Sequence, residues 1–299
     1  SKNKDGKTFS AFIKGLEPKT RYVYRAISND QDGSKIIGND VEFTTDYENE
    51  DNEGKPFVPN LGFDDWCTKS KLQYPYKDGT VPFWATGNTD VTILKFNFTT
   101  EVSGEVGSAA HLKSQIVMST KLAAGNLFTG TFELDGMDGI LTLGQSCKLR
   151  PTTLSGRYNY TPVNITTKYA TSDLPSYVQN GVPDTCSIYI ALTTSKVTVE
   201  TKNRVLFDKN DKSVIAYGEL SSDKASGTNG YQDFTIPLVY RKGKEAEIPV
   251  YIIIVCSASK FGDYFVGGDG SILLLDEFKL GFDYNPASFV GTSLEGLAE

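Results

Sequence analysis

Short stretches in which apolar and polar residues alternate run along most of the chain. In the stretch 187–193 every second side chain is Ile or Leu, which is typical of a β-strand that buries one face. No helical spacing of apolar residues is sustained for about 11 residues anywhere in the sequence. The pattern therefore predicts an all-β protein. The clearest predicted strands cover 92–99, 115–119, 130–134, 187–193, 214–220, 234–241, 249–257 and 271–281.

Turn-forming residues separate these stretches. Asp135-Gly136, Asn180-Gly181 and the Gly-Gly-Asp-Gly run at 267–270 are the chemistry of tight turns. The connections between predicted strands are irregular and some are long, and no internal repeat is visible. These features favour a jelly-roll β-sandwich over a propeller.

The first 47 residues carry a different signal. Residues 16–22 follow the pattern Leu-x-Pro-x-Thr-x-Tyr between strand-like stretches, which resembles the tyrosine corner of an immunoglobulin or fibronectin-III domain. Such a domain has about 100 residues, so only its C-terminal half is predicted here. Either upstream strands are lost or the next domain completes the half-sandwich. The predicted organisation is an Ig/fibronectin-III-like domain at 1–47, an acidic linker at 48–56, a jelly roll at 57–285 and a tail at 286–299.

Charge and hydropathy exclude several partners. The net charge is −7 and the pI is near 5.0, and the short basic run at 241–244 is typical of a solvated hairpin tip. Nucleic acid is therefore not an expected partner. No apolar run approaches about 20 residues, so no transmembrane segment is predicted. Because the chain opens at Ser1 without Met, a trimmed mature form or a fragment is expected.

The cysteine and histidine content argues against several types of metal site and catalytic site. The chain has four Cys, none in a Cys-x-x-Cys pair, and the single histidine His111, which argues against a zinc site, a Cys–His nucleophile or a Ser–His–Asp triad. Cys186 and Cys256 share strand parity with Ile residues, so they are predicted to be buried. Free thiols are the simpler interpretation, and a disulfide in an oxidising compartment is the alternative.

Several spaced motifs in the second part of the chain agree with one known family. They lie at 60–66 (NLGFDDW), 83–88, 122–130 (LAAGNLFTG), 144–152, 214–219, 255–263 (VCSASKFGD) and 274–278 (LLDEF). In this order they resemble the putative carbohydrate metabolism domain family over residues 57–282. The resemblance implies a jelly roll behind an Ig-like domain, a link to carbohydrate use, and export to the periplasm or cell surface with a lipid anchor before trimming. It also implies envelope-associated partner proteins, but it supplies no catalytic pair.

Acidic residues at both ends of the predicted jelly roll raise the question of a metal. By strand parity Asp276 lies on the face of Ile272, Leu274 and Phe278, where an ionised carboxylate is costly unless a cation or backbone donors pair with it. The two ends also resemble galactose-binding sandwiches, whose terminal acids hold a structural Ca²⁺, and this resemblance points to Asp64. Parity points instead to Asp65. The alternative is that these acids cap turns or pair with Lys and Arg. Structural calcium is the one cofactor considered.

Polar aromatic residues on strand faces suggest where a sugar binds. Tyr189 lies opposite the Ile layer of its strand, and Tyr217 shares a face with Glu219. Sugars present C–H faces to aromatic rings and hydroxyl edges to polar side chains. Aromatic and polar side chains must therefore converge at a sugar-binding site. Packing in the sandwich is the alternative role of each aromatic residue. The ligand-binding candidates are Trp66, Trp84, Asn88, Arg150, Tyr158, Tyr160, Tyr189, Tyr217, Glu219 and Lys260.

Catalysis needs two carboxyl groups across the glycosidic bond. Glu219 with Asp184 or with Asp263 is the candidate pair. Residues 133–138 approach an E-x-D-x-x-E glycosidase signature, but their Asp-Gly pairs predict a hairpin tip. We expect the chain to bind an oligo- or polysaccharide. A glycoside hydrolase or polysaccharide lyase on the same scaffold, and a structural or adhesive surface protein, are the alternatives.

Overall fold

The chain divides into two compact units. One comprises residues 1–57 and 281–299, and the other comprises Val58–Leu280. The structure is a computed structural model, and it describes residues 13, 16, 20–29, 33–45, 55–91, 94–117, 121–136, 138–166, 174–227, 230–244 and 247–282. The predicted tail at 286–299 and nearly all of the predicted linker lie outside these residues, as do residues 17–19 of the predicted Leu-x-Pro-x-Thr-x-Tyr corner.

The described part of the first unit is a long β-hairpin. Strand β1 (Arg21–Tyr24) pairs antiparallel with β4 (Val41–Thr44), and β2 (Ile27–Asn29) pairs with β3 (Lys35–Ile37). The ring of Phe43 contacts Tyr22 and Tyr24 at centroid distances of 5.8 and 6.0 Å. The described residues 20–29 and 33–45 contain only these two two-stranded ladders and no sandwich, so the Ig-like domain stays a prediction.

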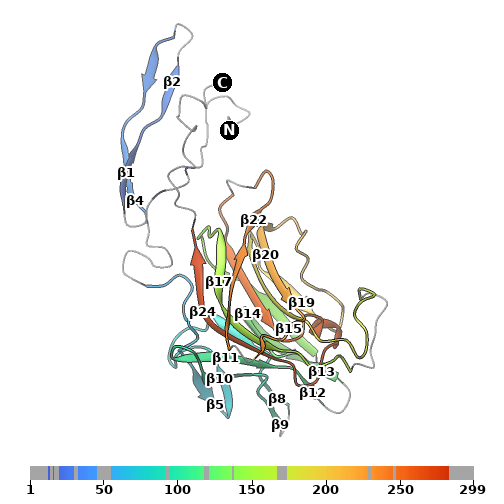
Figure 1. Cartoon of the computed structure of the whole chain (residues 1–299). Helices are drawn as coiled ribbons and strands as arrows, with labels where there is room; N and C mark the ends of the chain where they lie inside the picture. Colours follow the sequence, from blue (N-terminus) through green and yellow to red (C-terminus); the bar gives the residue numbers. More distant parts are fainter. Residues whose placement is uncertain are drawn as a thin grey trace. The chain divides into compact units, whose positions relative to one another are not determined.

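The second unit is built on two sheets (Figure 1). In the first sheet the strand order is β10 (Thr99–Ser103), β11 (Ser108–Lys113), β24 (Ile272–Gly281), β17 (Thr153–Thr161) and β21 (Gln232–Pro237). The second, nine-stranded sheet has the order β19 (Val197–Glu200), β15 (Asp138–Leu143), β14 (Asn126–Asp135), β23 (Tyr251–Ser257), β18 (Cys186–Thr193), β20 (Val214–Ser222) and β22 (Val239–Tyr240), with β7 (Trp84–Thr86) on β14 and β16 (Gln145–Ser146) on β23. Three two-stranded ladders join β5 (Cys67–Lys69) to β6 (Leu72–Tyr74), β8 (Thr89–Val91) to β9 (Leu94–Phe96), and β12 (Gln115–Val117) to β13 (Lys121–Ala123).

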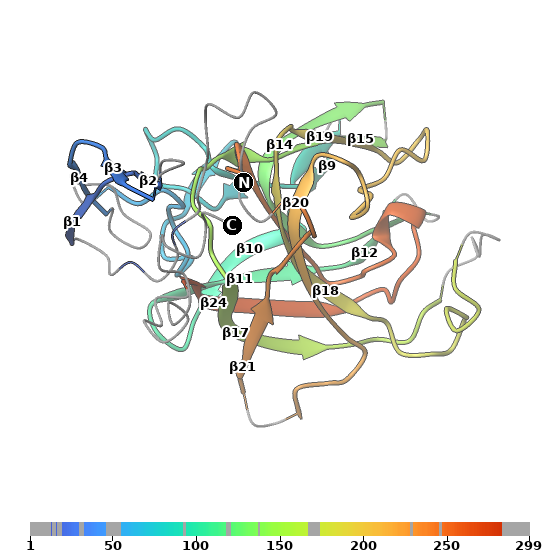
Figure 2. The same cartoon turned by 90° about the horizontal axis from the view of Figure 1, so that it is seen from above.

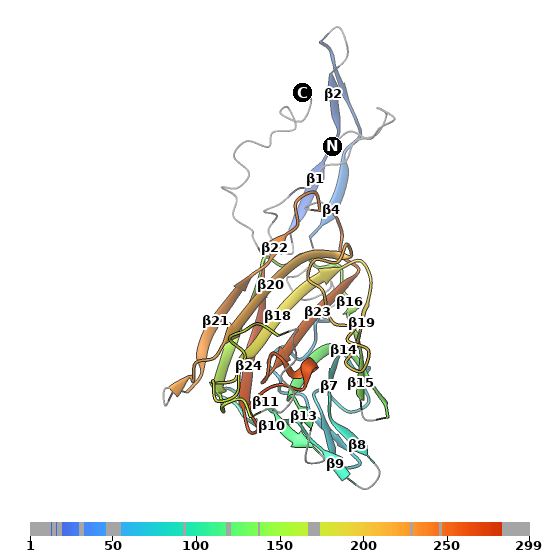
Figure 3. The ribbon, with the colours of Figure 1, turned by 90° about the vertical axis from the view of Figure 1, so that its right-hand side faces the viewer.

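The chain crosses repeatedly between the two sheets, as in a jelly roll. The chain passes from β17 to β18, from β20 to β21 and from β23 to β24, each time changing sheet. Figure 2 shows β10, β11, β24, β17 and β21 following one another as one layer, and Figure 3 shows β20, β18, β23 and β14 curving together as the other. The prediction of an all-β fold with a jelly-roll sandwich is confirmed.

The sandwich core follows directly from strand alternation. Ile188, Ile190 and Leu192 on β18 are fully buried, as are Ile252 and Ile254 on the neighbouring β23. Burying each such side chain stabilises the fold by about 2 kcal/mol. The first sheet contributes the equally buried residues Leu112, Leu154, Leu273 and Leu275.

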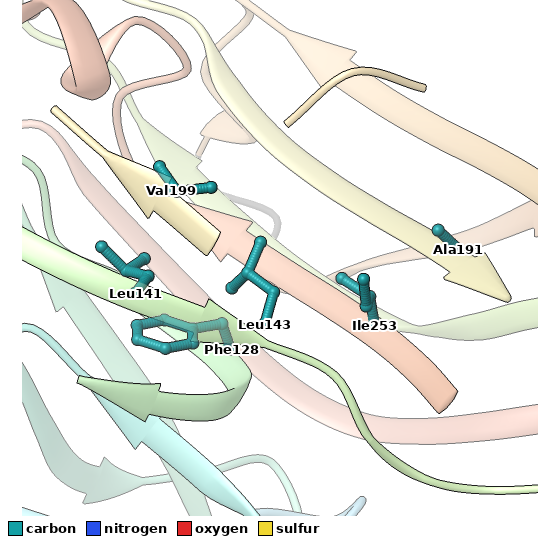
Figure 4. Close-up of a cluster of buried hydrophobic side chains, with 6 residues drawn as sticks. All are labelled: Phe128, Leu141, Leu143, Ala191, Val199 and Ile253. Atoms are coloured by element: carbon teal, nitrogen blue, oxygen red, sulfur yellow. The ribbon is translucent and has the colours of Figure 1, made fainter. Parts of the chain in front are cut away.

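The opposite face of the nine-stranded sheet also buries apolar side chains. Figure 4 shows this second cluster, which consists of Phe128, Leu141, Leu143, Ala191, Val199 and Ile253. Tyr189 and Tyr217 pack against it. The sequence therefore placed these tyrosines correctly outside the sandwich core. It did not predict that their face has an apolar layer of its own.

One strand departs from strict alternation. Glu277 in β24 has a φ of 51°, in the left-handed region. Leu273 and Leu275 before this irregularity are buried, and Phe278 and Leu280 after it are also buried. The predicted common face of Asp276 and Phe278 is therefore wrong, because the irregularity at Glu277 shifts the alternation by one residue.

Several predicted strand boundaries also differ. The predicted strand 92–99 is divided between β9 and β10, because the amide side chain of Asn97 binds the backbone of Lys71 and Gln73 instead of continuing a ladder. Residues 92, 93 and 119 lie outside the described part of the chain. The predicted turn at 135–138 is confirmed, since Asp135 pairs with Asp138 at the tip of the β14–β15 hairpin.

The four cysteines are free thiols. Burial raises the pKa of Cys147 to about 11 and that of Cys186 to about 12, and it raises the pKa of Cys256 well above its ordinary value. These thiols stay protonated near neutral pH and pack as apolar groups. The free-thiol interpretation therefore holds over the disulfide.

Gly218 is the position at which β20 meets β21 most closely. A Cβ there would lie 2.7 Å from Ile236 Cγ2 and would overlap the carbonyl oxygen of Pro237. We expect Gly218→Val to lower the free energy of unfolding by about 3 kcal/mol, because the backbone of β21 would have to move. Urea unfolding measures this loss. Thr235→Val, at an exposed position of β21, is the control and should change the value by less than about 0.5 kcal/mol; equal effects would contradict the close contact.

Candidate functional site

Two neighbouring strands bring the predicted tyrosines and glutamate together. In the antiparallel register of β18 and β20, Tyr189 lies opposite Glu219 and Ala191 lies opposite Tyr217. Residues that face each other across a ladder point to the same side of the sheet. Tyr189, Tyr217 and Glu219 therefore share one face, which we call the outer face of the nine-stranded sheet.

Three aromatic rings form a contiguous platform on this outer face. Phe207 comes from the loop between β19 and β20, and its ring stacks on Tyr189 at 5.0 Å and on Tyr217 at 6.1 Å. The two tyrosine rings lie 5.9 Å apart. All three side chains are half-buried, and the ammonium of Lys209 lies 5.7 Å from the centre of the Tyr217 ring. Such a platform presents both an apolar surface and a cation to a ligand.

A polar cluster borders the platform. The Glu219 carboxylate accepts hydrogen bonds from the hydroxyls of Ser221 (2.7 Å) and Tyr217 (3.0 Å), and it forms an ion pair with Lys260. The Lys260 ammonium also contacts the Ser221 hydroxyl at 2.8 Å. Burial raises the pKa of Glu219, but the hydrogen bonds from Lys260, Ser221 and Tyr217 outweigh it and hold the pKa below its ordinary value. Glu219 is therefore an ionised acceptor.

Asp263 is a second carboxyl group beside these residues, in the short 3₁₀ turn Gly262–Tyr264. Burial raises its pKa to about 6, although the charge of Arg204 opposes the shift. Arg204 donates to the backbone oxygen of Asp263 at 2.9 Å, and no hydrogen bond from the described residues reaches the carboxylate. The charge of Asp263 adds to burial in raising the pKa of Tyr189. Near pH 6 this carboxyl can take up or release a proton.

A cavity of about 200 Å³ lies next to Tyr189, Lys260 and Asp263. Its walls are largely aromatic and aliphatic and include Phe96, Phe98, Phe132, Val199, Val255 and Phe265. The cavity thus joins an apolar interior to the polar cluster at Lys260. Tyr189, Lys260 and Asp263 were all predicted from the sequence as site residues, and the structure brings them together here with Tyr217 and Glu219 alongside.

Asp184 has a different environment. It is fully buried and accepts hydrogen bonds from the Ser259 hydroxyl (2.5 Å), the Gly268 amide (2.8 Å) and the Thr185 amide (2.8 Å). Burial raises its pKa despite these bonds. Asp184 does not line the cavity, and its bonds fix the loop that carries Lys260 and Asp263.

Trp84 and Asn88 lie at a second hollow. The Trp84 side chain is 1% exposed, packs on Phe63 and donates its indole N–H to the Pro59 oxygen at 2.8 Å. Asn88 is buried and its amide bridges Gln73 and Thr99. Both residues border an open groove of about 370 Å³ together with Tyr74 and Tyr76. In this structure Trp84 and Asn88 hold the wall of the groove together by internal contacts.

Four other candidates are committed to internal contacts. The Trp66 indole donates to the Phe63 oxygen at 2.6 Å, and the Arg150 guanidinium lies 4.6 Å over the Tyr240 ring. Tyr158 and Tyr160 are buried, and the Tyr160 hydroxyl donates to the Ala258 oxygen at 3.0 Å. None of the four lines the cavity. Packing, the alternative considered for the two tyrosines, describes both of them.

Acidic residues from both ends of the sandwich meet at the β10–β11 turn. Asp276 is fully buried. Its Oδ2 accepts from the Glu105 amide at 2.9 Å, while its Oδ1 has no hydrogen-bond partner in the described part of the chain. Burial raises the pKa of Asp276, and the charge of Asp64 raises it further. Asp64 Oδ1 accepts from the Ser108 amide at 2.9 Å. The described residues contain no group of three or more His, Cys, Asp or Glu side chains arranged for a metal.

Of the two acids predicted at the opening of the sandwich, only one faces this turn. The Asp64 carboxylate approaches Gly62 and Gly107, where a Cβ would meet its oxygens. Asp65 is exposed, and its backbone amide and carbonyl oxygen both bond to the Asn60 side chain. The structure therefore places Asp64, the acid selected by the resemblance, at this turn. The parity argument for Asp65 is wrong because Phe63, with a φ of 57°, lies in the left-handed region and interrupts the strand geometry.

Two further residues of the site were not predicted. Phe207 completes the ring platform, and Thr201 lines the cavity with a buried hydroxyl that has no partner. Both lie between β19 and β20, in a segment whose sequence shows no alternation. The sequence signal in this segment is the apolar Leu206-Phe207 pair inside a polar loop. The pair indicates that Phe207 is buried, but not which surface it contacts.

Comparisons with known proteins agree on the fold. A crystal structure of a putative glycoside hydrolase from Bacteroides thetaiotaomicron is 21% identical, with a TM-score of 0.56 over 87% of this chain and 79% of that chain. One from Bacteroides vulgatus, also a putative glycoside hydrolase, is 21% identical with a TM-score of 0.50 over 74% and 97%. No curated protein matches the chain. At this identity the likeness shows the fold.

Membership of a family rests on a match to a family model. In the described part of the chain no helix has the length and apolar character to cross a membrane, in agreement with the all-β fold. The model of the putative carbohydrate metabolism domain matches residues 62–281, nearly the whole of the sandwich. Since this match covers more than half of the sequence, the chain belongs to the putative carbohydrate metabolism domain family.

Proposed function

We propose that the chain binds an oligo- or polysaccharide at the outer face of the nine-stranded sheet. The observation that carries this proposal is the convergence of the ring platform (Tyr189, Phe207 and Tyr217) with the polar cluster around Glu219 and Lys260. A sugar needs an apolar ring for its C–H face and charged partners for its hydroxyls within one sugar diameter. The family to which the chain belongs supports a role in carbohydrate metabolism.

The proposal includes the cellular setting. We propose that the protein is exported to the periplasm or the cell surface, where envelope-associated proteins deliver polysaccharide to it. A lipid anchor before trimming is part of this proposal. This setting is what the family resemblance of the sequence implies.

Hydrolysis is a second candidate function. It is favoured by two carboxyl groups with opposite pKa shifts beside Tyr189: Glu219 is held ionised, whereas Asp263 keeps its proton to about pH 6. A glycosidase divides its roles in this way, with one protonated acid for the leaving group and one ionised carboxylate. Reducing-sugar release from any bound glycan tests this function, and both Asp263→Asn and Glu219→Gln should abolish it.

We also propose a structural Ca²⁺ at the β10–β11 turn. The buried, unpartnered Oδ1 of Asp276 and the adjacent carboxylate of Asp64 support it, because hard cations prefer such oxygens. Bound there, a cation would neutralise a carboxylate whose burial is otherwise costly.

The binding proposal predicts a loss of affinity on removal of a platform ring. Glycan-array screening should identify a ligand, and Tyr217→Ala should weaken its binding about ten-fold, because a stacking ring and the hydroxyl bonded to Glu219 are both lost. Isothermal titration measures the change. Tyr24→Ala in the N-terminal hairpin, where the ring is also exposed, is the control and should bind normally. If no glycan on the array binds, the binding proposal is refuted.

The raised pKa of Asp263 predicts a pH-dependent stability difference. Asp263 has a folded-state pKa of about 6 against an ordinary value of 3.8, so it contributes stability below pH 4 that is lost as the pH rises through 6. The variant Asp263→Asn has no carboxyl group at this position, so its stability does not fall in this way. Between pH 4 and pH 7 the free energy of unfolding of the variant should therefore rise, relative to that of the wild type, by on the order of 2 kcal/mol. Urea unfolding across this range measures it, with the exposed Asp65→Asn as control; a difference that does not change with pH would refute the shift.

The calcium proposal predicts a metal-dependent melting temperature. Added Ca²⁺ should raise Tm by several degrees relative to a chelator, because binding to the folded state alone stabilises it. Asp276→Asn should lose the response, while Asp65→Asn, outside the acidic cluster, should keep it. Identical melting with Ca²⁺ and with chelator would exclude the site.

A further inference from the structure

The cavity beside Tyr189 has walls that do not suit a sugar ring. Its floor is the apolar cluster of Figure 4, from which Leu141, Leu143 and Val199 reach the cavity. Phe96 and Phe98 and the ring of Phe265 enclose it from other segments. A cavity with such largely apolar walls favours a ligand group that is itself apolar.

Most polar groups that line the cavity are already engaged. The Ser187 hydroxyl donates to Glu219, the Ser257 hydroxyl donates to the Ser259 oxygen, and the Ser259 hydroxyl donates to Asp184. The ammonium groups at its margin are also paired, Lys121 with Asp138 and Lys260 with Glu219.

A few polar groups that line the cavity remain available to a ligand, among them those of Thr201, Tyr189 and Asp263. The Thr201 hydroxyl is buried and has no hydrogen-bond partner among the residues that the structure describes. The structure gives no hydrogen bond to the Tyr189 hydroxyl or to the Asp263 carboxyl among the residues it describes. A pyranose carries hydroxyls around its whole edge, and each one left unpaired in a buried site costs about 1–3 kcal/mol. So few donors and acceptors cannot satisfy such a ring.

Size and polarity together identify a different ligand group. A dry cavity of about 150 Å³ holds a benzene ring, so one of about 200 Å³ holds a phenyl ring with one small polar substituent. We infer that this cavity binds an aromatic substituent carried by a glycan, while the sugar itself lies on the ring platform beside Glu219 and Lys260. The inference rests on the proposed function, because the sugar would occupy the surface proposed there. A phenolic hydroxyl in the cavity would meet Thr201, Tyr189 or Asp263.

The test compares sugars with and without an aryl group. Isothermal titration of the full chain uses methyl β-glycosides of glucose, galactose, mannose and xylose, the matching 4-nitrophenyl β-glycosides, and phenol alone. We expect at least one 4-nitrophenyl glycoside to bind ten-fold or more tightly than its methyl counterpart, and phenol to bind and compete with it. Equal affinity of every aryl and methyl pair overturns the inference.

A cavity-filling variant locates the effect. Val255→Phe places a ring in the cavity and should remove the aryl advantage, whereas Val239→Phe, at a position 71% exposed on β22, should retain it. If circular dichroism shows Val255→Phe unfolded, Val255→Leu replaces it and should reduce the aryl advantage several-fold. Retention of the full advantage in the folded variant overturns the inference.

The outcomes separate the two proposals. Methyl glycosides that bind as tightly as aryl glycosides would support the sugar platform and refute the aromatic cavity. Phenol that binds and competes at the cavity while no glycoside binds would support the cavity's preference for a ring and refute glycan binding at the platform.

Discussion

The hydrogen bonds of one buried carboxylate hold the candidate site together. Asp184 receives bonds from the Ser259 hydroxyl and the Gly268 amide, and Ser259 in turn contacts the Ser114 hydroxyl at 2.6 Å. The loop between these anchors carries Lys260 and Asp263. A buried carboxylate is stable only when such donors satisfy it, so the position of the site loop depends on this network. Loss of the Asp184 carboxylate would leave buried hydroxyl and amide donors without an acceptor.

The nine-stranded sheet supports the site because both of its faces are buried. Its inner face closes the sandwich core with Ile188 and Ile190, while its outer face carries the second apolar cluster. Side chains on such a sheet have little freedom to rearrange. The platform rings and the cavity floor are therefore preorganised, which lowers the entropy cost of binding a ligand.

Charge is distributed unevenly around this rigid surface. Glu219 lies among hydroxyls and an ammonium group, so its charge is satisfied, whereas Asp263 faces apolar surroundings and holds its proton to about pH 6. Sugar binding needs only the first of these two environments. Acid–base chemistry would use both, and the same geometry therefore accommodates binding and hydrolysis on one scaffold.

The sequence by itself determined the fold class and part of the site. Alternation in 187–193 and 214–220 fixed which side chains face the core, and it placed Tyr189, Tyr217 and Glu219 on the opposite face, because the period of a strand is local. Only the tertiary structure decided which of the other candidates join them. Trp84, Asp184 and Tyr160 are polar or aromatic like the site residues, yet contacts from distant segments commit them to the interior. Phe207, Thr201 and Asp263 reach the site from irregular loops, and their position depends on long-range packing that no local pattern records.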